Sequence, residues 1–146
     1  MNNIKDDLFY VCALIEYTAR KTKNRRRAIV NALGEKGIHK QLHDACVNHC
    51  LSFEQVSDEL IEEYSISESD FDTVSNCKYS VPNFQDIGRL YSILVLMCAE
   101  NQEYEKEVKN IFSSFISDEI SNFNTDLYYQ NPDYLKCSYQ AGYLLE

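Results

Sequence analysis

An all-α fold is the class that this sequence predicts, and three observations predict it. Only four glycines and two prolines occur in 146 residues, whereas folds built from strands need many turns and therefore more of these residues. Apolar residues recur at helical spacing through most of the chain. Side chains that favour helix N-termini precede several of these stretches. We therefore expect a compact bundle of six or seven helices, forming a single domain over residues 1–146.

The first two helices are predicted in the N-terminal quarter of the chain. Asp6 or Asp7 is suited to cap a helix that runs to about Lys21 and carries a broad apolar stripe. Asn24 is suited to cap a short second helix. Gly34 follows that helix, and glycine readily adopts the left-handed conformation that ends many helices.

The third and fourth helices are predicted on either side of a short break. Residues 38–49 form the third helix, and residues 53–64 form the fourth. Ser52 and Gln55 make a capping box, in which each side chain can satisfy a backbone N–H at the start of the fourth helix. The apolar residues of that helix share one face, which we expect to pack on the bundle.

A polar segment over residues 65–82 interrupts the helical pattern. It is rich in serine and aspartate and has no sustained periodicity, so we expect a loop with at most one helical turn, at residues 68–71. A loop of this length is unusual inside a compact domain. It divides the chain into subregions 1–64 and 83–146, between which it could act as a hinge.

The remaining helices are predicted in the C-terminal half. Asn83 is suited to cap a helix over residues 84–99, which are apolar nearly all round, as is typical of the buried centre of a bundle. Residues 103–123 are amphipathic and are expected to form one long helix. Asn131 followed by Pro132 predicts the start of a last helix, which Gly142 is suited to end.

Charge is distributed unevenly in this chain, whose net charge is −9. Residues 1–50 carry nine Lys and Arg against five acids, giving +4, and residues 51–146 carry five against 18, giving −13. An acidic surface opposes nonspecific binding to nucleic acid or membranes. The longest apolar run has ten residues, too few to cross a bilayer, and no signal peptide is recognisable. We expect a cytoplasmic protein with reduced cysteines and no membrane partner.

The densest positive charge lies between the first two predicted helices. Six cations occur there within eight residues, namely Arg20, Lys21, Lys23, Arg25, Arg26 and Arg27. Such a cluster could contact the phosphates of a nucleic acid or an acidic protein partner. It could also pair with the acidic half of the same chain. The sequence leaves these three interpretations open.

Four residues of the third predicted helix are candidates for metal binding, because their offsets place them along one face: His39, His43, Cys46 and Cys50. On one straight helix the outer pair would be about 16 Å apart, too far to share one zinc ion. A site would need a break in the helix or another ligand. A cysteine beside His43 or His49 could also serve as a nucleophile with its base. No established catalytic motif is present, so we predict neither an enzyme nor a cofactor.

The C-terminal segment is dense in tyrosine, with five residues at Tyr128, Tyr129, Tyr134, Tyr139 and Tyr143. Tyrosine buries a large area while keeping a hydroxyl group for hydrogen bonding, and it is enriched at binding surfaces. These side chains could hold the C-terminus on the bundle. Alternatively, they could form an exposed aromatic patch that binds a partner.

Three segments of the N-terminal part carry a family resemblance: FYVCALIEYTARKTKNRRRAIVNALGEKGI, HDACVNHC and FEQVSDELIEEY. Over residues 8–64 the chain resembles short helical proteins of uncharacterised function from Firmicutes and Bacteroidetes. These are often encoded beside a small toxin with an ADP-ribosyltransferase-like fold. The resemblance implies an antitoxin or accessory role, with a toxin or another neighbouring gene product as partner. It implies no catalytic residues.

The sequence as a whole predicts a non-catalytic protein-binding module, antitoxin-like or inhibitor-like, that sequesters a partner protein. One alternative is a nucleic-acid-binding regulator that uses the cluster from Arg20 to Arg27. A variant of it is an acidic mimic of nucleic acid that inhibits a nucleic-acid enzyme. A further alternative is a Cys/His enzyme or zinc protein.

Overall fold

The computed structural model describes residues 3–146 and confirms the all-α class. Within that range it contains seven α-helices and one short 3-10 helix, and no helix there is long and apolar enough to cross a membrane. The elements are α1 (Ile4–Thr22), α2 (Arg26–Asn48), α3 (Phe53–Glu63), α4 (Phe84–Cys98), α5 (Tyr104–Ser113), α6 (Phe115–Ser121), the 3-10 helix η1 (Leu127–Tyr129) and α7 (Pro132–Ala141).

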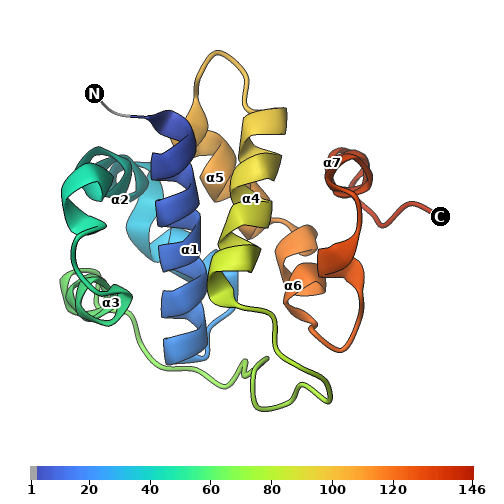
Figure 1. Ribbon diagram of the computed structural model, residues 1–146, viewed down its shortest axis with the longest axis horizontal. Coiled ribbons are helices and arrows are strands. Elements are labelled where there is room, and N and C mark those ends of the chain that lie inside the picture. The colour runs from blue at the N-terminus through green and yellow to red at the C-terminus, as the bar shows by residue number, and fades with distance from the viewer. Residues whose placement is uncertain (1–2) are drawn as a thin grey trace.

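Helices α1 and α4 lie side by side in the middle of the molecule and run in opposite directions (Figure 1). Helix α2 packs on α1 and α5, α3 packs on α1, and α7 packs on α4. One hydrophobic core therefore contains side chains from both predicted subregions, such as Leu8 and Ile15 of the first and Leu94 and Phe112 of the second. The subregions 1–64 and 83–146 are packed into each other, and residues 65–82 pass along one end of the bundle.

Three of the predicted helix starts are observed, and two are not. Ser52 accepts a hydrogen bond from the Gln55 N–H, and Asn83 and Asn131 cap α4 and α7 in the same way. The predicted cap at Asp6 or Asp7 is wrong, because Asn3 caps α1 by accepting from the Lys5 N–H. The two aspartates lie inside the first turn, where the helix dipole favours negative charge.

Asn24 was also wrongly predicted as a cap. Its side-chain amide donates to the Thr22 hydroxyl and to the Ser67 carbonyl, so it ties the α1–α2 turn to the polar loop. Helix α2 begins without a side-chain cap. It continues from the second predicted helix into the third through a kink at Gly34, whose φ of 68° and ψ of 175° suit glycine because it has no Cβ.

Two further predictions are corrected in the second half of the chain. The helix expected over residues 103–123 is interrupted at Ser114, which has extended backbone angles and caps α6 by accepting from the Ile116 N–H. In the polar loop, the predicted turn at residues 68–71 is absent. A turn occurs at residues 73–76, where the Asp72 carboxylate accepts two backbone N–H bonds.

The close packing of α1 on α4 depends on Gly88. A Cβ added at this position would lie 2.5 Å from the Ala13 Cα, well inside van der Waals contact. The two central helices approach closely here because residue 88 has no side chain.

We predict that Gly88→Ala lowers the free energy of unfolding by about 1–3 kcal/mol, because the helices must separate to admit the methyl group. Urea denaturation followed by circular dichroism measures the change. Gly37→Ala is the matched control, since its Cβ would meet side-chain atoms of Tyr64 and Leu33 at 3.0 and 3.1 Å and no backbone atom of another helix. An unfolding curve for Gly88→Ala that overlays that of the wild type would show that the close approach is not required.

Candidate functional site

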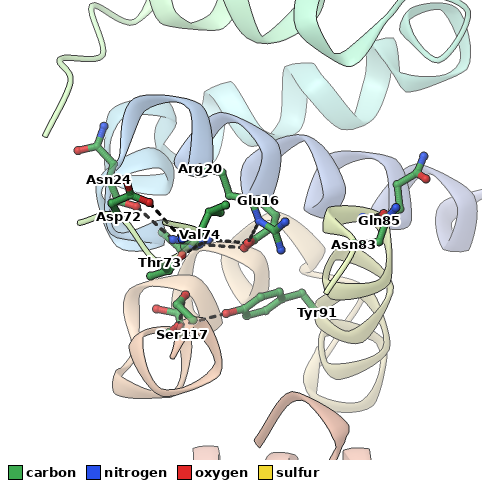
Figure 2. Close-up of polar contacts among 12 residues, drawn as sticks. Glu16, Arg20, Asn24, Asp72, Thr73, Val74, Asn83, Gln85, Tyr91 and Ser117 are labelled. Carbon is green, nitrogen blue, oxygen red and sulfur yellow. Dashed lines mark hydrogen bonds and ion pairs between the residues drawn. The ribbon is translucent and has the colours of Figure 1, made fainter. Parts of the chain in front are cut away.

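The basic segment is anchored by a buried ion cluster around Glu16 of α1. Arg26 donates from Nε and Nη2 to the two carboxylate oxygens of Glu16 at 2.8 and 2.5 Å. Arg20 donates from Nε to the same carboxylate at 2.7 Å. The side chains of Glu16 and Arg26 are fully buried. Figure 2 shows this cluster, with Tyr91 of α4 nearby and directed toward the Ser117 carbonyl.

The arginines keep Glu16 ionised in spite of its burial. Burial by itself would raise the pKa of Glu16, but the charges and hydrogen bonds of Arg26 and Arg20 together lower it below its usual value. In the same way, burial works against the charge of Arg26, and Glu16 more than compensates, so the pKa of Arg26 is raised. Because both groups stay charged, they join α1 firmly to the start of α2.

We predict that Glu16→Met lowers the free energy of unfolding by about 3–5 kcal/mol, because it leaves a buried arginine without its partner. Glu16→Met combined with Arg26→Met should cost less than Glu16→Met alone, since no buried charge is then left at residue 26. Because folding lowers the pKa of Glu16, the stability that this residue contributes depends on pH. The contribution is complete above its unfolded-state pKa and is lost as the pH falls through its folded-state pKa. Urea denaturation of the wild type and the two variants between pH 7 and pH 3 measures both effects; a double variant less stable than Glu16→Met alone would contradict the pairing.

The other cations of the segment also pair with acids of this chain. Lys21 contacts Asp58 at 2.5 Å, and Lys23 lies 3.9 Å from Glu68. Arg25 and Arg27 both donate to one oxygen of Asp118, at 2.8 and 2.6 Å. All six cations therefore have an intramolecular acidic neighbour. Arg26 is inside the core and cannot form part of a binding surface.

The histidines and cysteines of α2 are spread along its exposed surface. His39 contacts Glu105 at 2.9 Å, and His43 lies beside the adjacent Asp44. Within residues 3–146, no three His, Cys, Asp or Glu side chains are close enough together to hold a metal ion. Cys46 and Cys50 are exposed free thiols.

The five C-terminal tyrosines are in different environments. The Tyr134 hydroxyl donates to the Leu145 carbonyl at 2.6 Å, and the Tyr139 hydroxyl donates to Glu107 at 2.7 Å. These two bonds hold α7 and the chain after it on the bundle. Tyr128 is half-buried and its ring lies tilted against that of Tyr129, while Tyr129 and Tyr143 are exposed.

A groove of about 500 Å³ runs along the first turns of α1. We call it the aromatic groove. Residues at the C-terminal end of α2 form another part of the lining, and α3 and α4 each add one residue from their first turn. The lining residues are Asn3, Asp6, Asp7, Phe9, Tyr10, Ala45, Cys46, His49, Phe53 and Gln85.

Aromatic stacking holds the walls of the aromatic groove in place. The ring of Phe53 stacks on Tyr10 at 5.3 Å between centroids and meets Phe84 edge-on at 4.9 Å. The Tyr10 hydroxyl donates to the Asn48 carbonyl at 3.3 Å, joining α1 to the end of α2. Sequence reasoning placed the apolar residues of the first and fourth predicted helices on stripes that pack in the bundle and missed the groove, because helical spacing does not tell which apolar residues line a concave surface.

Asp7 is the unusual residue of the aromatic groove. It is only 8% exposed, and among residues 3–146 its carboxylate has neither a hydrogen bond nor an ion pair. Burial raises the pKa of Asp7, the charge of Asp6 raises it further, and His49 opposes both effects. The signal for Asp7 in the sequence was the presence of two adjacent aspartates, Asp6 and Asp7, where the start of a helix needs only one. Neither carboxylate oxygen of Asp7 is among the solvent-excluded side-chain atoms of residues 3–146 that lack a hydrogen-bond partner, so the carboxylate keeps contact with the groove that Asp7 lines and is open to an incoming group.

Two exposed apolar side chains lie near the lining residues of the aromatic groove in sequence. Val47 is 67% exposed and Leu51 is 38% exposed. Val47 lies in the last turn of α2 and Leu51 in the α2–α3 connection, which also carries the lining residue His49. Comparison with known proteins adds nothing to this geometry: the chain matches no family model, no curated protein and no solved structure.

We predict that Asp7→Asn raises the melting temperature at pH 7, by about 2–4 °C for each kcal/mol gained, because the buried charge is removed. For an acid with a raised pKa, ionisation costs stability at high pH, and this cost disappears as the pH falls through the raised value. The advantage of the variant should therefore shrink on acidification. Asp133→Asn is the control, because Asp133 is an exposed aspartate in the first turn of α7 and the variant loses the same favourable helix-dipole interaction away from the groove. Thermal melts between pH 7 and pH 3.5 measure both variants; a lower melting temperature for Asp7→Asn at pH 7 would refute the argument.

Proposed function

We propose that this chain is a non-catalytic protein-binding module, antitoxin-like or inhibitor-like, that sequesters a partner protein by docking it on the aromatic groove. The observation that carries the proposal is the groove itself, which is lined by three aromatic rings and by the largely buried Asp7, whose carboxylate lacks a partner within the described residues. Its volume is in the range of ligand sites, and such sites combine apolar walls with a few convergent polar groups.

The surface around the groove favours a protein over a small molecule as the ligand. Val47 and Leu51 are exposed apolar residues near the lining residues in sequence, and protein interfaces have an apolar centre inside a polar rim. A small molecule inside the groove would leave both of these side chains in water. A protein segment would cover them.

Charge favours a partner with a basic surface. The net charge is −9, and the cations of the Arg20–Arg27 segment have intramolecular acidic neighbours. A surface with these properties attracts a basic protein and repels the phosphate backbone of a nucleic acid. The same charge is expected to accelerate association at low ionic strength.

Co-expression with the product of the neighbouring gene tests this function. We expect a stoichiometric complex whose affinity falls about tenfold or more when Val47→Glu places a charge on the docking surface. Val74→Glu, the same change at an exposed valine of the polar loop, should have no effect. Both variants should keep the stability of the wild type within about 0.5 kcal/mol, because the sites are exposed. Isothermal titration calorimetry measures the affinities; equal binding by the two variants, or no complex, would refute the proposal.

A further inference from the structure

We infer that the aromatic groove recognises one basic side chain, lysine or arginine, that lies beside an apolar residue in the docked segment of the partner. The inference rests on the proposed function and specifies what the groove selects. It depends on three features of the groove: the state of Asp7, the rings around it, and the apolar rim.

The first feature is a carboxylate that the chain leaves without a partner. Asp7 is 8% exposed and lines the groove, and no cation among residues 3–146 lies within ion-pair distance of it. On the same helix, Glu16 is buried with two arginines. An incoming cation would give Asp7 the charged partner that Glu16 already has, and a charge-assisted hydrogen bond is stronger than a neutral one.

The second feature is the set of rings beside that carboxylate. Phe9, Tyr10 and Phe53 line the same groove, and the methylene stem of a lysine or arginine packs well on such rings. Phe9 already takes part in one cation–π contact, with the Arg89 guanidinium 4.3 Å from its ring centroid. These rings would bind the stem while Asp7 binds the charge.

The third feature is the charge and polarity of the rim. Asp6 adds a second carboxylate to the lining. His49 donates from Nδ1 to the Ala45 carbonyl at 3.1 Å, which fixes its ring orientation at the end of α2. Val47, in the last turn of α2, and Leu51, in the α2–α3 connection, are exposed and can contact an apolar residue next to the bound cation. Together these groups favour a segment that is both basic and apolar.

Peptides that differ only in the ammonium group test the inference. Acetylated and amidated Gly-Leu-Lys-Leu-Gly is titrated into ¹⁵N-labelled protein alongside the same peptide with norleucine in place of lysine. We expect the lysine peptide to shift the amide signals of Asp7, Phe9 and His49. We expect the norleucine peptide to bind about tenfold more weakly, which corresponds to about 1.4 kcal/mol.

Asp7→Asn should weaken the binding of the lysine peptide about tenfold and leave the binding of the norleucine peptide unchanged. Asp133→Asn is the matched control, because Asp133 occupies the first turn of α7 but is exposed and far from the groove in sequence; it should change neither affinity. The same spectra show whether each variant is folded. The inference is overturned if both peptides bind equally, if Asp7→Asn has no effect, or if the lysine peptide does not bind the groove at about 10 mM.

Failure of this inference can be separated from failure of the proposed function. If Val47→Glu weakens the natural complex while lysine and norleucine peptides behave alike, the groove binds a protein without selecting a cation. If the lysine peptide binds as expected and no partner complex forms, the cation site is real and the sequestering function is wrong.

Discussion

The rest of the structure depends on the buried carboxylate of Glu16 and the two arginines that neutralise it. This cluster fixes the start of α2 against α1, and α2 in turn packs on α5. A charge in the core is tolerated only where its partners approach closely enough to offset its desolvation. The lowered pKa of Glu16 indicates that they do. The orientation of the central helices thus depends on an electrostatic constraint as well as on apolar packing.

The same cluster decides which surface of the molecule is available for binding. A segment with six cations in eight residues suggests a phosphate-binding surface when it is read in isolation. In the folded chain one of these cations is in the core and the others lie beside acids. The aromatic groove differs from this segment, because Asp7 lies buried there without the arginines that compensate Glu16. The contrast between two buried carboxylates on one helix is the main structural argument for a binding function.

Much of the fold could be predicted because it follows from local patterns. Apolar spacing located the helices, and Ser52, Asn83 and Asn131 marked three of their starts because a short polar side chain can satisfy a nearby N–H of its own chain. Asn24 failed as a cap because it bonds to Ser67, across a turn that local patterns do not describe. The break at Ser114 was missed because the apolar stripe continues on both sides of it.

The sequence by itself determined the all-α class, most helix positions, the acidic net charge and the clustering of cations, because each depends on composition or on neighbours within one turn. Only the tertiary structure decided which charges are paired, which aromatic rings line a groove, and which aspartate is left without a partner in the described chain. Those properties depend on contacts between residues far apart in sequence, such as Arg27 with Asp118 and Phe53 with Tyr10. Whether each of these two carboxylates of α1, Glu16 and Asp7, has a partner depends on which residues of the other helices pack beside it.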